Sequence, residues 1–197
     1  MPEIATLREQ IAWAYANLAQ AHAAKEAGVE RYKPVHYAIR NRLFSGLTAG
    51  TLSMRTLCDD ERLKMTLPQC CVYCGSKRFL SLDHLIPKKK NGSESSDNIV
   101  WACRSCNSSK SDKDLIEWFG SRGDFPSIFI LRRYLKLIFA ICEERNILDI
   151  PFESIDISSL PFSASSFPLK FPRLRDLVLW VSDEGGGCGS IEPRFGD

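Results

Sequence analysis

The sequence lacks both a long uninterrupted apolar segment and a large net charge. Its longest apolar stretch, residues 127–142, contains three basic residues, so we expect that it does not cross a membrane. Three charged residues within the first nine positions interrupt any apolar region of the kind found in secretory signals. The formal net charge of +2 does not by itself indicate a nucleic-acid partner. These absences favour a cytoplasmic protein without a membrane partner.

Cysteine, in contrast, is abundant, and four of the eight cysteines form two C-x2-C pairs. The pairs are Cys71 with Cys74 and Cys103 with Cys106. In a chain without a secretory signal, this spacing indicates metal binding rather than disulfide formation. Four thiolates close a tetrahedral site with no open position, so we expect a structural Zn²⁺ ion at these four residues.

The remaining cysteines leave one alternative open. Cys70 directly precedes Cys71, and a Cys70-x3-Cys74 pair is possible, although x2 is the commoner spacing. We interpret the three others as buried or incidental thiols: Cys58, Cys142 and Cys188.

Length and apolar periodicity predict the organisation of the chain. At 197 residues and 44% apolar content, it favours one domain, or one small domain with helical additions, and no internal repeat is visible. The N-terminal part predicts a helix over 2–28, a helix from Pro34, a loop over 45–53 and a short helix. The middle predicts a strand at 79–86, a polar loop at 88–98, a strand at 99–102 and a helix reaching Phe119. The remainder predicts a helix opened by Asp124 and Pro126, a last helix over 172–181, and a flexible tail.

Charge is distributed unevenly along the chain. Between Cys71 and Lys113, eight basic and four acidic residues leave a local excess of four positive charges. A basic patch of this kind attracts a polyanion, whereas the simpler interpretation is a solvated lysine-rich loop.

The residues in this window resemble the HNH nuclease family. The resemblance rests on Cys71-x2-Cys74, the run Asp83-His84-Leu85-Ile86-Pro87, Asn98 before the second strand, and Cys103-x2-Cys106 followed by Asn107. It covers about a fifth of the chain, and Gly92 stands alone where many members have a glycine pair. The resemblance implies an α+β protein, in which a zinc-stabilised ββα-metal (HNH) core is embedded in a mainly α-helical chain. We divide the chain accordingly into a helical region (1–67), an HNH module (68–120), a second helical region (121–184) and the tail (185–197).

The resemblance also implies a role for each polar residue of the motif. His84 would be the general base, and Asp83 and Asn107 would hold Mg²⁺ or Mn²⁺. Asn98 would tie the hairpin loop and orient His84. Six basic residues would contact nucleic-acid phosphates: Lys88, Lys89, Lys90, Arg104, Lys110 and Lys113.

The expected function is metal-dependent hydrolysis of DNA phosphodiester bonds, leaving 5′-phosphate and 3′-hydroxyl ends. One such site cuts one strand, so double-strand cutting would need a homodimer, two events or a partner nuclease. One alternative is a non-catalytic zinc module that binds DNA or protein. Another is a nuclease subunit of a larger complex, such as a defence or restriction system. The sequence does not distinguish DNA from RNA, because the phosphate chemistry is shared apart from the 2′-hydroxyl.

Overall fold

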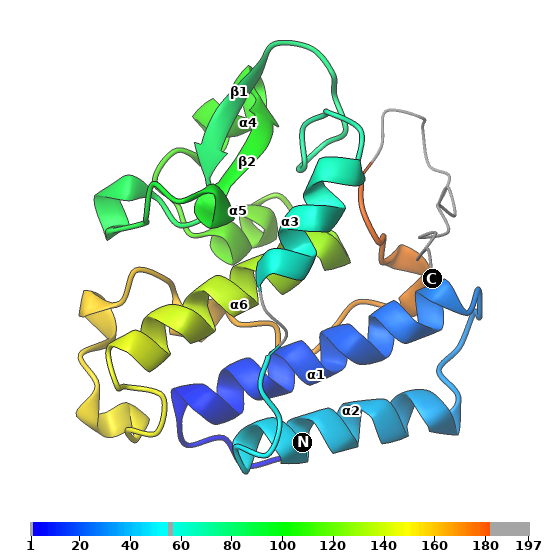
Figure 1. The fold of residues 1–197 in the computed structure, drawn as a ribbon, viewed down its shortest axis with the longest axis vertical. Helices are drawn as coiled ribbons and strands as arrows, with labels where there is room; N and C mark the ends of the chain where they lie inside the picture. The colour runs from blue at the N-terminus through cyan, green and yellow to red at the C-terminus, as the bar shows by residue number, and fades with distance from the viewer. Residues whose placement is uncertain (1, 55–56, 182–197) are drawn as a thin grey trace.

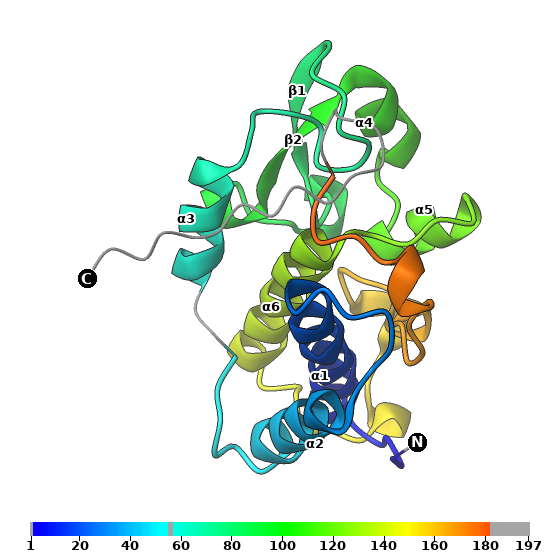
Figure 2. The ribbon, with the colours of Figure 1, turned by 90° about the vertical axis from the view of Figure 1, so that its right-hand side faces the viewer.

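The computed structural model describes residues 2–54 and 57–181. It is 53% helical and has one small two-stranded antiparallel sheet among these residues, so the predicted α+β class is confirmed. The sheet lies at one end of the molecule and helices α1 (Leu7–Glu26) and α2 (Pro34–Thr48) lie at the other. Helix α6 (Ile128–Glu144) crosses between them, as Figures 1 and 2 both show.

Helix α1 begins at Leu7 because Thr6 caps it: Thr6 Oγ1 accepts from the N–H of Glu9, and the Glu9 carboxylate accepts from the N–H of Thr6. Helix α2 begins at Pro34, as predicted. It continues to Thr48, so the predicted loop over 45–53 was wrong in its first four residues. Gly46 lets Leu52 pack closely on the end of the helix, because a Cβ atom at residue 46 would lie 2.4 Å from the Leu52 side chain.

The predicted short helix is α3 (Leu57–Thr66), and it packs on α6 through buried ion pairs. Asp60 lies 2.7 Å from the ammonium of Lys136 and 3.0 Å from the guanidinium of Arg132. The neighbouring Arg133 is fully buried, pairs with Glu61, and donates to the carbonyl of Asp97 at 2.7 Å. The basic residues that interrupt the apolar stretch of α6 therefore join this helix to α3 and to the loop before the second strand.

The middle of the chain forms strand β1 (Leu80–His84), strand β2 (Ile99–Cys103) and helix α4 (Arg104–Lys110). Leu80 pairs with Cys103 and His84 with Ile99, so β1 and β2 are antiparallel. Two 3₁₀ turns, Lys88–Lys90 and Ser96–Asn98, lie in the connecting loop.

The predicted continuous helix up to Phe119 was wrong. Helix α4 ends at Lys110, and Ser111 adopts a positive φ of 50°, which breaks the helical path. Asp114 then caps a new helix, α5 (Leu115–Ser121), by accepting from the N–H of Ile116 at 2.8 Å.

The last predicted helix, over 172–181, was also wrong, since only a 3₁₀ turn at Leu174–Asp176 forms there. The following backbone instead supplies its carbonyls to α6: Val178 accepts from the N–H of Ile128, and Leu179 from that of Phe129. The predicted tail, 185–197, and Cys188 lie outside the described residues.

One connected apolar core includes buried residues of α1, the β1–β2 hairpin, α5 and α6. The division at residues 67, 120 and 184 therefore stays a prediction. Among the described residues, no helix is long and apolar enough to cross a membrane.

Candidate active site

The four paired cysteines converge beside the sheet. Their sulfur atoms all lie within 4.8 Å of one another, and the Sγ atoms of Cys74 and Cys103 are 3.7 Å apart. A tetrahedral ion with Zn–S bonds of about 2.3 Å would separate its sulfurs by roughly 3.8 Å. The donor chemistry and the spacing therefore fit a structural zinc ion held by Cys71, Cys74, Cys103 and Cys106.

The backbone around the first pair forms a tight turn. The N–H of Gly75 donates to the carbonyl of Cys71 at 2.8 Å, and Gly75 has a φ of 79° that favours glycine. Cys70 is directed away from the cluster, and its thiol donates to the carbonyl of Val181 at 3.6 Å. The choice of Cys71 over Cys70 is therefore consistent with the structure.

Burial changes the ionisation of two of these thiols. It raises the pKa of Cys71 and Cys106. Burial also disfavours the Cys103 thiolate, but the N–H of Cys106 and the neighbouring thiols outweigh it and lower the pKa of Cys103. A bound cation would supply the charge that keeps all four sulfurs ionised.

His84 is the last residue of β1, and its imidazole is partly accessible. The Nε2 atom lies 3.3 Å from Oε2 of Glu94, and the other carboxylate oxygen of Glu94 pairs with Lys88. The hydrogen bond with Lys88 is the main cause that lowers the pKa of Glu94. Sequence reasoning missed Glu94, because an acid in a polar loop reads as solvated.

Asp83 precedes His84, and its carboxylate is buried. Its Oδ2 atom accepts from the hydroxyl of Tyr73 at 2.6 Å and lies 3.2 Å from Nζ of Lys110. Burial first, and then the charge of Asp83, raise the pKa of Tyr73 well above its usual value. Tyr73 was also missed, although its place between two zinc ligands is a usable signal.

Lys110 does not have the position predicted for it. Its side chain is 0% exposed, and Nζ donates to the carbonyl of His84 at 2.6 Å as well as pairing with Asp83. A side chain so enclosed does not reach a phosphate on the surface, so the predicted phosphate contact was wrong for this residue. Burial lowers the pKa of Lys110, and Asp83 partly offsets that effect.

Asn98 binds the backbone of the loop that follows His84. Its Oδ1 accepts from the N–H of Ile86 at 2.8 Å, and its Nδ2 donates to the carbonyls of Ile86 and Ser93, both at 2.9 Å. The side chain therefore closes the loop from inside.

Asn107 instead lies against β1, where its Nδ2 donates to Ser81 Oγ at 3.0 Å and to the carbonyl of Leu82 at 3.1 Å.

These features coincide with a known family. Residues 71–113 match the family model described as HNH endonuclease. This part of the chain is an HNH domain. No curated protein and no solved structure matches the chain. An HNH domain indicates nuclease-type activity in general.

A shallow pocket of about 170 Å³ opens where β1 of the HNH domain ends. Asp83 and His84 both line it, although they point to opposite faces along an ideal strand. The strand ends at His84, and this allows both side chains to meet the same space. The other lining residues are Pro87, Lys88, Lys89, Ser111 and Asp112.

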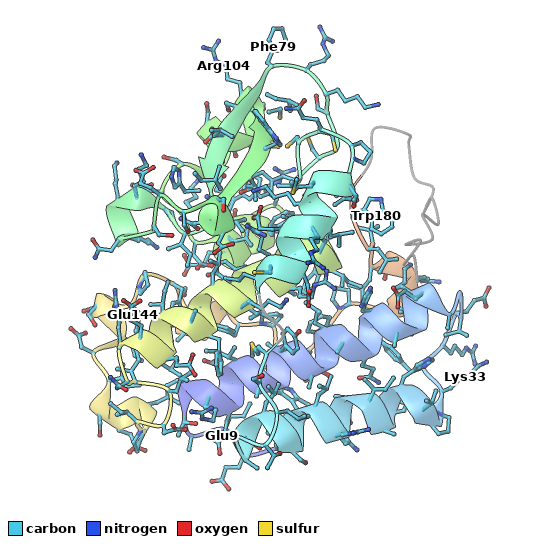
Figure 3. All side chains as sticks on the ribbon, viewed as in Figure 1. Glu9, Lys33, Phe79, Arg104, Glu144 and Trp180 are labelled. Atoms are coloured by element: carbon cyan, nitrogen blue, oxygen red, sulfur yellow. The ribbon has the colours of Figure 1, made fainter. Side chains whose placement is uncertain are left out.

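The basic residues of the HNH domain are not all near this pocket. Lys88 and Lys89 line it and are exposed, and Lys113 is exposed with its ammonium on the carbonyl of Ser109. Lys90, which is half-buried, does not line the pocket. Arg104 follows Cys103, which pairs with the far end of β1, so it lies about four residues or roughly 13 Å along the strand from His84. Figure 3 shows Arg104 beside Phe79 at the outer tip of the domain.

Oxygen atoms of the kind that a hard divalent cation prefers are present at the end of β1. Asp83 offers a carboxylate in the pocket lining. Asn107 does not line the pocket, but its Nδ2 contacts the carbonyl of Leu82, beside Asp83 in sequence, and its Oδ1 remains an acceptor. Among the described residues, the cysteine cluster is the only group of three or more candidate ligands. A catalytic cation here would therefore take its remaining oxygens from water and substrate.

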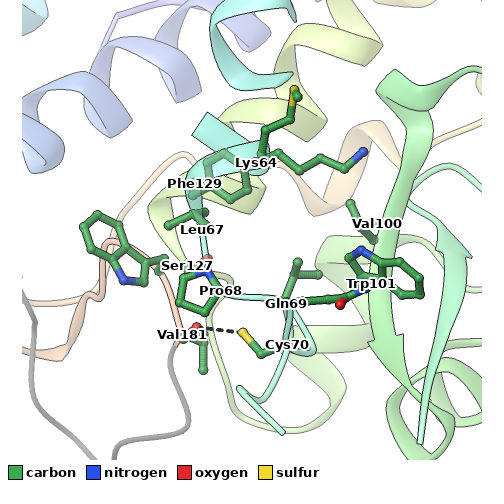
Figure 4. A pocket seen from close by; sticks show the side chains of 13 residues that line it. Lys64, Leu67, Pro68, Gln69, Cys70, Val100, Trp101, Ser127, Phe129 and Val181 are labelled. Atoms are coloured by element: carbon green, nitrogen blue, oxygen red, sulfur yellow. Dashed lines mark hydrogen bonds between the residues drawn. The ribbon is translucent and has the colours of Figure 1, made fainter. Parts of the chain in front are cut away.

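A larger pocket of about 300 Å³ lies between α3, β2 and the segment that ends at Val181 (Figure 4). Its lining is mainly apolar and includes Trp101 and Phe129. Within the described chain, no residue lines both pockets, so this one is separate from the polar groups at His84.

Proposed function

We propose that the protein is a metal-dependent endonuclease that hydrolyses DNA phosphodiester bonds at the end of β1. The observation that carries the proposal is that His84 and Asp83 line one pocket together with Lys88 and Lys89. A general base, an oxygen ligand and two cations at one opening are the groups that attack on a phosphodiester needs.

Each side chain has a distinct task in this proposal. Lys88 and Lys89 bind the phosphate through charge and position the backbone. His84 removes a proton from the attacking water, and the carbonyl contact with Lys110 fixes the backbone that carries the imidazole. Asp83 and Asn107 would hold Mg²⁺ or Mn²⁺, which when bound stabilises charge on the phosphate and on the leaving 3′ oxygen.

A phosphate that approaches His84 and Lys88 meets the carboxylate of Glu94, which pairs with both. Glu94 is 68% exposed at its side chain and lies in a loop, so the substrate can displace it at low cost. The nitrogen of His84 that faces Glu94 then becomes free to face the water.

The number of cuts and the biological setting belong to the same proposal. One pocket per chain cuts one strand, so a double-strand break requires a homodimer, two cutting events or a partner nuclease. A defence or restriction enzyme, or the nuclease subunit of a larger complex, fits a small HNH domain with helical regions on both sides. A cytoplasmic setting would keep the zinc thiols reduced.

The test is incubation with supercoiled plasmid in Mg²⁺ or in EDTA, for the wild type and for His84→Ala. Loss of a general base lowers the rate by about 10²–10⁴-fold. Zinc content and circular dichroism of His84→Ala serve as folding controls, and a single-stranded RNA substrate tests DNA against RNA. Equal cutting by the two proteins would place the base elsewhere.

A second function is favoured by one observation: Asp83 is already neutralised by a buried lysine. A non-catalytic zinc module that binds DNA or protein would keep this pair and the four cysteines. Such a module retards DNA on a gel without cutting it in any divalent metal, and the plasmid assay separates the two functions.

A further inference from the structure

Every carboxylate at the candidate active site has a lysine partner. Lys110 lies 3.2 Å from Asp83, and Lys89 lies 3.3 Å from Asp112. Lys88 forms an ion pair with Glu94. The three acids and three lysines leave no net negative charge to attract a free divalent cation. The cation site is thus charge-balanced before any metal arrives.

The Lys110–Asp83 pair differs from the other two because it is enclosed. Both side chains are buried, at 0% and 7% exposure, whereas the partners in the other pairs are at least half exposed. Surface pairs exchange readily with solvent ions, but a buried pair that loses one member leaves an uncompensated charge. The Tyr73 hydroxyl, 2.6 Å from Asp83 Oδ2, further fixes the carboxylate beside Lys110.

A divalent cation on Asp83 would lie within a few ångströms of the Lys110 ammonium. The two like charges repel, and they do so more strongly in this enclosed place than in water. A DNA phosphate changes the balance, because it adds negative charge and competes with Glu94 and Asp112 for their lysines. The cation would then be held by Asp83 and the phosphate together.

We infer that the site binds its divalent cation together with the DNA phosphate and not before it, and that Lys110 is the residue that imposes this order. The inference rests on the proposed function. Lys110 is a positioning residue here, since it acts through Asp83 and touches neither water nor phosphate. Binding is reciprocal, so DNA tightens the cation to the same extent as the cation tightens DNA.

The test is a Mn²⁺ titration of zinc-loaded protein without DNA. The concentration of unbound Mn²⁺ is measured at each point by electron paramagnetic resonance. Lys110→Gln removes the charge but keeps an N–H for the carbonyl of His84. It should bind Mn²⁺ about tenfold or more tightly than the wild type. Lys170→Gln, which removes an exposed lysine outside the HNH domain, is the matched control and should leave the affinity unchanged. Adding Asp83→Asn to Lys110→Gln should abolish the gain.

A second measurement does not depend on the folding of Lys110→Gln. His84→Ala is titrated with Mn²⁺ in the presence and absence of a short duplex, and binding by the duplex alone is subtracted. The affinity should rise about tenfold or more with DNA. Equal affinities with and without DNA would overturn the inference, as would equal affinities of the wild type and a folded Lys110→Gln.

Wild-type cutting of plasmid in Mn²⁺ separates the two proposals. Plasmid could be cut while the Mn²⁺ affinity is the same for the wild type and Lys110→Gln, and the same with and without duplex. In that case the binding order is wrong and the nuclease function stands. If plasmid is not cut in any divalent metal, the proposed function itself fails.

Discussion

Asn98→Ala should destabilise the protein without removing a metal ligand. The side chain is 1% exposed and makes three hydrogen bonds with the loop, two with Ile86 and one with Ser93. A hydrogen bond of this kind contributes about 1 kcal/mol net, so the loss of three lowers the free energy of unfolding by about 3 kcal/mol. For a chain of this size, that loss lowers Tm by roughly 6–12 °C. Alanine cannot replace these contacts, and Ile86 is itself buried, so water does not reach its freed N–H and carbonyl.

The assay is urea unfolding of the zinc-loaded protein, with the denaturation midpoint read by circular dichroism. Asn107→Ala is the matched control, because its two hydrogen bonds lie where water can replace them, and it should lose less than about 1 kcal/mol. The Mg²⁺ concentration for half-maximal cutting should rise in Asn107→Ala and stay unchanged in Asn98→Ala. An Asn98→Ala protein that unfolds at the wild-type midpoint but needs more Mg²⁺ would refute this assignment of the two asparagines.

Three further predictions concern the same region. Gly92→Ala should destabilise the protein by about 2 kcal/mol or more, since a Cβ atom would lie 1.8 Å from the carbonyl oxygen of Ile86 and 2.9 Å from Asn98 Nδ2. In urea unfolding, the double variant with Asn98→Ala should lose less free energy of unfolding than the sum of the two single variants, because both substitutions open the same loop. Metal analysis should find one zinc per chain, and a strong chelator should lower the midpoint and abolish cutting even in excess Mg²⁺. Glu94→Gln should lower the Kd for duplex DNA by up to about fivefold in an anisotropy titration, since it frees Lys88 and His84 from an exposed pair; weaker binding would show that Glu94 helps to place them.

The four-cysteine cluster could be predicted from the sequence because metal ligands commonly occur in pairs with short local spacings. Each C-x2-C pair brings two thiols together within one turn, and the β1–β2 pairing, in which Leu80 lies opposite Cys103, brings the two pairs to one point. The strands on either side of the loop followed from similar local patterns, and the start of α2 from its proline. The break between α4 and α5 could not be predicted in this way, since nothing in a serine-rich stretch announces a positive φ at Ser111.

The burial of charged side chains could not be predicted from the sequence either. Lysine is almost never enclosed without a partner, so Lys110 reads as a surface cation until Asp83 is placed beside it. Arg133 poses the same difficulty, because its partners Glu61 and Asp97 are remote in sequence. Both pairings depend on the tertiary arrangement of α3, α4, α6 and the hairpin, which periodicity does not describe.

Helix α4 connects the zinc cluster to the candidate active site. The helix is capped at its start by Cys103, which accepts from the N–H of Cys106, and it ends at Lys110. A metal that fixes Cys103 and Cys106 therefore fixes the first turn of α4, and with it Asn107 and Lys110, which contact β1 on either side of Asp83. Tyr73, between the other two ligands, reaches the same carboxylate directly. The two halves of the cysteine cluster thus converge on Asp83, so an ion held by the four thiols would help to fix the geometry of Asp83 without taking part in the proposed reaction.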